Sequence, residues 1–282
     1  MFSRKLAVTA LVVSGLAVFV SSCKRDKKDD NIINNETTAY AEEQLMLEQI
    51  YANADRVVDI AITMGVGSLK GGENPLGGCT TIKTDTTGDS AVHVMTINFG
   101  GGKCLGFDGR YRSGKLIVHY TQGLSINDTG YYRKTIFDAY VVDGHRVGGY
   151  RTMSYKGKTP AGNHYHEIAS VDTIYQPGNT GQLTGASERQ REWYKGSSTL
   201  QTADDVYRIT GSGYFVGPYK DKYHLEIVKP LSDALDCSWI KEGVTNIFPE
   251  GATQRVLDYG AGDCDNDAVI NVNGVKRIAK IP

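Results

Sequence analysis

From about residue 79 onward, the chain is built of short segments in which apolar and polar residues alternate. This period of two is typical of β-strands that are buried on one face. Asp108-Gly109, Asp143-Gly144, Pro177-Gly178 and Asn273-Gly274 separate several segments, and Asp-Gly and Asn-Gly favour the positive φ angles of tight hairpins. The segments that we expect to be strands are 91–99, 115–120, 134–142, 146–155, 164–175, 205–211, 223–228, 239–248, 254–259, 268–272 and 275–281.

About eleven or twelve short strands joined by hairpins favour an antiparallel meander, because no helices alternate with them to make a parallel sheet. The predicted fold class is therefore mainly β: a single antiparallel multi-stranded meander, forming a curved sheet or an open barrel or sandwich. All-β folds of roughly 240 residues occur as one domain, which we expect over residues 38–282. Val147-Gly148-Gly149 departs from common strand and turn composition and weakens the prediction there.

One segment, residues 38–62, has the period of an amphipathic helix. Thr37 or Thr38 can cap it, and Glu42 and Glu43 lie in the first turn, where the helix dipole favours negative charge. We expect this helix to pack on the sheet, although a spacer or partner-binding helix near the membrane is the alternative. The apolar positions recur every three or four residues and are Leu45, Leu47, Ile50, Ala54, Val57, Val58 and Ala61.

The first residues of the chain have the pattern of a secretory signal. Arg4 and Lys5 precede an apolar run over residues 6–20, and small residues then lead into Cys23. Val20-Ser21-Ser22-Cys23 resembles a bacterial lipobox, which implies cleavage before Cys23 and a diacylglycerol on its thiol. Residues 1–22 are then the signal peptide. A plain membrane anchor is the alternative, but about 15 apolar residues are fewer than the roughly 20 that a spanning helix needs.

Residues 23–37 are predicted to form a lipidated, flexible tether. The residues after Cys23 are mostly charged or polar and cannot bury enough apolar surface to order themselves. Lipid chains on Cys23 would anchor the protein to the outer membrane, on the periplasmic face or at the cell surface. The formal charge is −1 for the whole chain, and removing Arg4 and Lys5 with the signal peptide gives −3. This value is too small to indicate nucleic-acid binding.

Four cysteines remain after Cys23, an even number with three possible pairings. We favour disulfides between Cys79 and Cys104 and between Cys237 and Cys264, since each pair is close in sequence and can flank adjacent strands. Free buried thiols are the alternative. A zinc site is not indicated, because no two of these cysteines have the spacing of two to four residues that such sites use.

Alternating carboxylates around the last cysteine form the only candidate metal site. Such an arrangement can surround calcium, which takes six to eight oxygen ligands. The glycine of the sharp turn and the bidentate glutamate of a calcium loop are missing, so a solvated hairpin loop is the competing interpretation. No other cofactor is predicted. The four candidate ligands are Asp258, Asp263, Asp265 and Asp267.

Five segments together resemble a family of Bacteroidota lipoproteins that has no established activity. The resemblance covers most of the chain from about residue 79 to the end, and it implies lineage and location but supplies no catalytic residues. The segments are 108–118 (DGRYRSGKLIV), 189–193 (RQREW), 204–211 (DDVYRITG), 237–240 (CSWI) and 257–266 (LDYGAGDCDN).

Side chains suited to binding are more frequent than those suited to catalysis. His164 and His166 would share one face of a strand, as two metal ligands can, but exposed strand residues are the simpler interpretation. Seventeen tyrosines can form an aromatic surface for sugar or protein. No nucleophile elbow, phosphate loop, zinc-protease helix or dinucleotide-binding glycine pattern is present.

Two functions remain open. The first is a non-enzymatic envelope lipoprotein that binds a glycan, a lipid or another envelope protein. The second is a hydrolase that acts on envelope or surface polysaccharides and needs two carboxylates about 5 to 10 Å apart across a cleft. An exposed aromatic strip would favour glycan binding, and an apolar cavity would favour a lipid carrier. No binding or catalytic residue can be assigned from the sequence.

Overall fold

The computed structural model describes residues 35–64, 74, 76–85, 91–106, 108–199 and 201–282. The predicted signal peptide and the predicted tether up to residue 34 lie outside the described residues. Helix α1 spans Asn35–Met64, so the last three residues of the predicted tether belong to the helix. No helix in the described part of the chain combines the length and the hydrophobicity that a membrane-spanning helix requires.

The described strands form one antiparallel sheet that is not closed, as the mainly β prediction expected. Successive strands pair in chain order from β1 to β14, except that β3 pairs only with β4. The short 3₁₀ helices η1 (Pro177–Asn179) and η2 (Thr202–Asp204) lie between strands. The strands are β1 Thr81–Asp85, β2 Val92–Asn98, β3 Cys104–Leu105, β4 Tyr111–Thr121, β5 Tyr132–Val142, β6 His145–Lys158, β7 His164–Tyr175, β8 Gln182–Lys195, β9 Val206–Val216, β10 Lys222–Ala234, β11 Glu242–Pro249, β12 Arg255–Ala261, β13 Asp267–Val272 and β14 Val275–Lys280.

Two of the predicted tight turns have the expected backbone conformation. Asp143-Gly144 joins β5 to β6 with φ angles of 48° and 87°, and Asn273-Gly274 joins β13 to β14 with φ angles of 52° and 84°. At Val147-Gly148-Gly149, where the strand prediction was weak, β6 continues without interruption. Gly149 has a φ of 98°, and a Cβ there would lie 1.9 Å from the carbonyl oxygen of Val171, so only glycine fits at this bulge.

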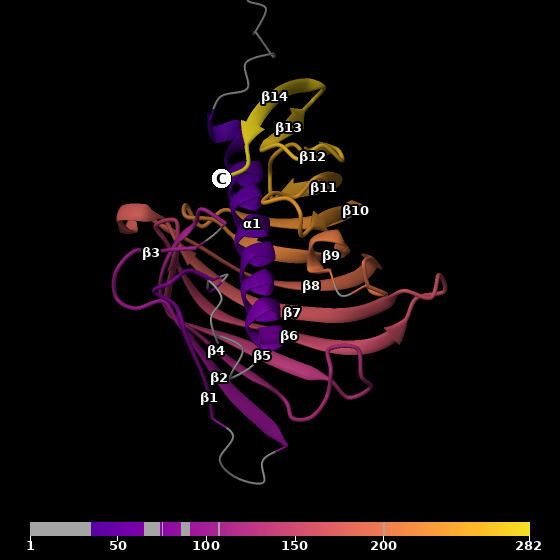
Figure 1. Ribbon diagram of the computed structural model, residues 1–282. Helices are drawn as coiled ribbons and strands as arrows, with labels where there is room; N and C mark the ends of the chain where they lie inside the picture. The colour runs from indigo at the N-terminus through magenta and orange to yellow at the C-terminus, as the bar shows by residue number, and fades with distance from the viewer. Residues whose placement is uncertain (1–34, 65–73, 75, 86–90, 107, 200) are drawn as a thin grey trace, which may run out of the picture. The chain divides into compact units, whose positions relative to one another are not determined.

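Helix α1 lies across one face of the sheet, and the strands curve around it (Figure 1). The predicted apolar stripe is buried, but the prediction of an amphipathic helix is incomplete, because every residue from Gln44 to Asp55 is buried. On the side away from the sheet, the Gln49 amide donates a hydrogen bond of 2.6 Å to the carbonyl oxygen of Ser238. The Asn53 amide likewise donates one of 2.9 Å to Asp108. The helix is therefore enclosed rather than resting on a surface.

Both predicted disulfides are formed. Cys79 is bonded to Cys104 at the start of β3, and Cys237, between β10 and β11, is bonded to Cys264, between β12 and β13. The sequence separations are 25 and 27 residues. Loops of this length contribute roughly 3 kcal/mol each in the chain-entropy model. The second bridge fixes the loop that covers α1 to the carboxyl-terminal strands.

Candidate binding surface

A row of polar side chains on α1 faces the sheet, at spacings of three or four residues that place them on one side of the helix. Its members are Glu48, Tyr51, Asp55 and Asp59. Arginines on β5, β6 and β8 point toward them from the sheet, and all are at least 95% buried: Arg133, Arg151, Arg189 and Arg191.

Each carboxylate of this row is paired with one or two arginines. Glu48 lies 2.6 Å from Arg189, and Asp55 lies 3.2 Å from Arg133 and 3.0 Å from Arg151. Asp59 lies 2.8 Å from Arg191 and also pairs with Arg133. The helix and the sheet are thus joined by a connected network of buried ion pairs. We call these seven side chains, with Tyr51, the helix–sheet network.

The arginines of the network lower the pKa values of Asp55 and Asp59 and keep both carboxylates ionised. Burial by itself would raise the pKa values of Asp55 and Asp59, but the charges of the arginines outweigh burial and lower both. Tyr51 is held differently, since its hydroxyl donates to Asp172 on β7 and lies 3.2 Å from the Ser170 hydroxyl. The charges of these groups are paired between α1 and the sheet, which is a structural role, although Nε and one Nη of Arg151, Arg189 and Arg191 have no hydrogen-bond partner among the described residues.

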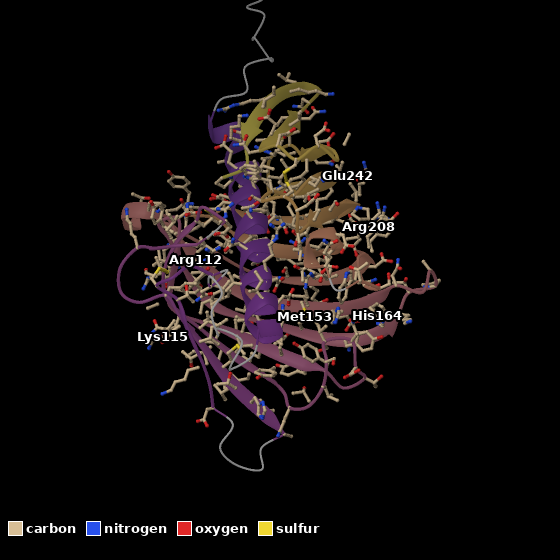
Figure 2. All side chains as sticks on the ribbon, viewed as in Figure 1. Arg112, Lys115, Met153, His164, Arg208 and Glu242 are labelled. Carbon is tan, nitrogen blue, oxygen red and sulfur yellow. A yellow bond between two sulfur atoms is a disulfide. The ribbon has the colours of Figure 1, made fainter. Side chains whose placement is uncertain are left out.

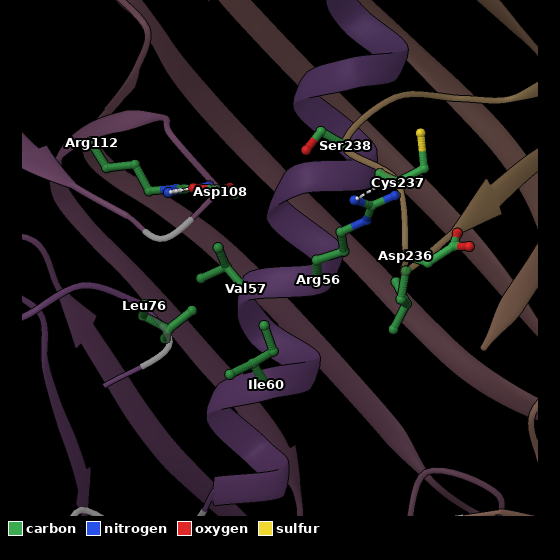
Figure 3. Close-up of a pocket in the computed structure, with 10 residues that line it drawn as sticks. Arg56, Val57, Ile60, Leu76, Asp108, Arg112, Asp236, Cys237 and Ser238 are labelled. Carbon is green, nitrogen blue, oxygen red and sulfur yellow. Dashed lines mark hydrogen bonds and ion pairs between the residues drawn. The ribbon is translucent and has the colours of Figure 1, made fainter. Parts of the chain in front are cut away.

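A pocket of about 250 Å³ lies beside α1 (Figure 3). Val57, Ile60 and Leu76 line it, and Figure 3 shows Arg112 on one side of the view and Arg56 on the other. Arg56 pairs with Asp233 and donates a hydrogen bond of 2.6 Å to the carbonyl oxygen of Cys237. This side of the pocket therefore has its positive charge already neutralised.

The opposite side of the pocket is formed by Arg112 on β4 and Asp108, which form an ion pair. Burial would raise the pKa of Asp108, but the hydrogen bonds and charge of Arg112 lower it to about 2. Asp108 is therefore ionised at neutral pH and cannot act there as a general acid. The pocket therefore has a small apolar floor between two arginines whose charges are neutralised. The Asp108–Arg112 pair does not supply a general acid for hydrolysis.

The four predicted calcium ligands line one small hollow of about 110 Å³ between β12 and β13. Asp258 and Asp265 accept hydrogen bonds from backbone amides two residues ahead, as in ordinary Asx turns, and Asp267 pairs with Lys280. Among the residues that the structure describes, no three His, Cys, Asp or Glu side chains are placed to hold a metal ion. The calcium site stays a prediction.

The two predicted histidines do share a face of β7, but they have separate partners. His164 Nδ1 lies 2.8 Å from the Tyr155 hydroxyl, and His166 Nε2 lies 2.7 Å from the carbonyl oxygen of Ile126. His166 is buried, and its burial lowers its pKa to about 4. Figure 2 shows His164 toward the end of the strands and Met153 nearer to the helix.

The face of the sheet that is turned away from α1 carries a continuous row of mostly apolar side chains. The strand pairings place one residue of each strand from β4 to β11 directly opposite the next. Tyr150 is 37% exposed, Val171 46% and Tyr214 73%. We call this set the outer row: Ile117, Ile136, Tyr150, Val171, Ala186, Tyr214, His224 and Phe248.

Three aromatic rings stack on one another at one end of the outer row. The rings of His224 and Phe248 are nearly parallel, at 13°, with centroids 4.6 Å apart. The Tyr214 ring lies 5.7 Å from His224 at 37°. On its other side, Tyr214 is opposite Ala186, whose methyl group is too short to cover an aromatic ring. Tyr214 thus presents a ring that is held on one side and open on the other.

Polar side chains flank the outer row on both sides, two residues away along each strand. The charges among them balance, with Lys115, Lys134 and Lys222 against Asp138, Glu188 and Glu226. The first flank consists of His119, Lys134, Thr152, Ala169, Glu188, Ser212, Glu226 and Asn246. The second flank consists of Lys115, Asp138, Thr173, Thr184, Val216 and Lys222.

The sequence predicted an aromatic surface but not its members. Of the tyrosines, Tyr150 and Tyr214 are in the outer row, whereas Tyr131, Tyr207 and Tyr223 are buried. Tyr150, His224, Phe248 and Val171 were not anticipated. Alternation within each strand shows which of its side chains lie on the same face. Only the pairing register between the strands shows that these four residues lie side by side in one row.

No known protein provides a guide to function. No protein-family model matches this sequence, and neither the curated proteins nor the solved structures contain a significant match. Function is therefore inferred from the side chains and their arrangement in the structure.

Proposed function

We propose that this chain is an envelope lipoprotein, anchored to the outer membrane through lipid on Cys23, with a non-enzymatic binding role. The basic start, the apolar run and the small residues before Cys23 support the anchor. The proposed binding surface is the outer face of the sheet.

The observation that carries this proposal is the contrast between the two faces of the sheet. Helix α1 occupies the inner face, where buried residues and ion pairs hold it. The pocket beside α1 is small, about 250 Å³, and the paired side chains of Arg56 and Arg112 flank it. The outer face bears the exposed outer row, and exposed apolar and aromatic side chains in a contiguous arrangement are typical of binding sites. The ligand therefore meets the outer face.

The alternative function, a polysaccharide hydrolase, is less well supported. It needs a protonated carboxylic acid and a second carboxylate across a cleft. In the pocket beside α1, Asp108 has a lowered pKa and pairs with Arg112, and Asp236 is 57% exposed and lies 3.7 Å from Lys241. Asp108 therefore stays ionised and cannot serve as the general acid in this pocket, so binding is the better interpretation.

The anchor predicts a lipid-dependent location. Cells that express the wild-type protein should incorporate labelled palmitate into it and retain it in the outer-membrane fraction, whereas Cys23→Ala should incorporate none. Proteinase added to intact cells then distinguishes surface display from the periplasmic face. Equal palmitate incorporation by wild type and Cys23→Ala would contradict the anchor.

The binding surface is tested by photocrosslinking in growing cells. A photoreactive benzoylphenylalanine at position 214 should form an adduct with an envelope macromolecule on irradiation. The same residue at position 219, which is 90% exposed but lies outside the outer row, is the matched control. Absence of an adduct at 214, or equal adducts at both positions, would overturn the proposed surface.

A further inference from the structure

We infer that the ligand of the outer row is a linear, electrically neutral polysaccharide, and that Tyr214 and Ala186 form its main sugar-binding subsite. This inference rests on the proposed function and specifies its ligand. The shape of the row, the Tyr214 ring and the flanking residues support it.

The outer row is long and narrow. It crosses eight strands, and seven steps of about 4.8 Å between strands give a length of about 34 Å. Its width is about one residue, because most of the positions two residues away on the same face are polar, with Gly148, Ala169 and Val216 as the exceptions. A chain of linked sugars has this shape. A protein partner typically needs about 800 Å² of surface with a broad apolar core, which a single row does not provide.

Tyr214 is the ring best placed to receive a sugar. An aromatic face carries negative electrostatic potential, which attracts the C–H groups on the flat side of a pyranose. The ring is 73% exposed, His224 supports it on one side, and Ala186 leaves room on the other. Tyr150 is less available, because the Lys134 ammonium lies 4.3 Å from the centre of its ring.

The residues around this subsite can bind hydroxyl groups. Thr184 and Glu188 lie two residues before and after Ala186 on β8, and Ser212 lies two residues before Tyr214 on β9. Hydroxyl and carboxylate oxygens accept hydrogen bonds from sugar hydroxyls, and Thr and Ser also donate them. The charges of the flanks balance, so nothing in the row selects a polyanion. A neutral chain matches this composition.

The test is affinity electrophoresis of the full-length lipoprotein in detergent. The gels contain a β-1,4-glucan, a β-1,3-glucan, an α-mannan, a galactan or, as the charged comparison, polygalacturonate. We expect at least one neutral polysaccharide to retard the wild-type protein more than polygalacturonate does. Tyr214→Ala should weaken that interaction about tenfold, the loss expected for one aromatic contact.

Three further variants separate ring stacking from other causes. Tyr214→Phe should retain most of the retardation, because the ring is kept. Ala186→Leu should weaken it by filling the space beside the ring. Tyr219→Ala removes an exposed tyrosine outside the outer row and should have no effect. Circular dichroism and thermal unfolding check that each variant is folded.

The possible failures are distinguishable. If no neutral polysaccharide retards the protein, or if Tyr214→Ala and Tyr219→Ala behave alike, the polysaccharide inference is wrong. If photocrosslinking at position 214 then captures a protein rather than a glycan, the outer face still binds a ligand and only the ligand class is overturned. If position 214 yields no adduct, the binding surface itself is wrong as well.

Discussion

Asp59→Ala should lower the free energy of unfolding by about 3 to 5 kcal/mol, the usual loss when one partner of a buried ion pair is removed. Asp59 accepts from both Arg133 and Arg191, and each arginine side chain is only 1 to 2% exposed. Without Asp59, Arg191 retains its charge in a buried site and loses its ion-pair partner. Urea unfolding at pH 7, followed by circular dichroism, measures the change.

An exposed ion pair provides the matched control. Asp138 and Lys115 lie 3.6 Å apart, with side chains 49% and 46% exposed. Asp138→Ala should change the free energy of unfolding by less than about 1 kcal/mol, because solvent screens such pairs. If Asp59→Ala and Asp138→Ala had equal effects, the helix–sheet network would not be what holds α1 in place.

The second large effect is a pH dependence that Glu43 and His166 produce in opposite directions. Burial, and then the negative charge of Asp221, raise the pKa of Glu43 from 4.5 to about 7, although the Tyr223 hydroxyl donates to it at 3.3 Å. The stabilisation from protonated Glu43 is fully present below pH 4.5 and is lost as the pH rises to about 7.

The contribution of His166 to the unfolding free energy depends on pH in the opposite direction. Its burial lowers its pKa from 6.5 to about 4, so its contribution is fully present above pH 6.5 and is lost as the pH falls toward 4. Each shift is worth about 3 kcal/mol. The two contributions therefore oppose each other between about pH 4.5 and 6.5, and the wild-type protein should show little net dependence from them.

Glu43→Gln should reveal this compensation. Compared with wild type, the variant should gain about 2 to 3 kcal/mol in unfolding free energy between pH 5 and pH 8, because the loss caused by ionised Glu43 is removed. His166→Gln should show the reverse difference, with its relative gain at low pH. Urea unfolding across this range measures both curves. Parallel curves for wild type and Glu43→Gln would contradict the assignment.

The sequence predicts strands well where a short hairpin turn joins two strands that are adjacent in the chain. Asp143-Gly144 and Asn273-Gly274 mark turns through their own backbone preferences, which do not depend on distant residues. Strand β8 was missed, because its inward positions hold Arg189 and Arg191 rather than apolar residues. Those arginines form ion pairs with carboxylates on α1, more than 100 residues earlier, as the separations of 141 and 132 residues show. Local alternation cannot reveal such pairing.

The candidate binding surface was even less accessible from sequence. The abundance of tyrosine predicted an aromatic surface, but membership in the outer row depends on the register of eight strands. Bulges near Ala139 and Gly149 shift that register, as do others in β10 and β11. A shift of one residue would move each side chain to the opposite face. The alignment of Tyr214 with Ala186 therefore follows from the assembled sheet.

The most direct test of the outer face as the binding surface is hydroxyl-radical footprinting of tyrosines, read by mass spectrometry. Modification is compared between the protein in intact cells and the purified protein. A bound ligand should reduce modification of Tyr214 several-fold in cells, while Tyr219, in the turn between β9 and β10 and outside the outer row, should be modified equally in both samples. If Tyr214 and Tyr219 changed by the same factor, the outer row would not be covered in the envelope and the proposed function would be wrong.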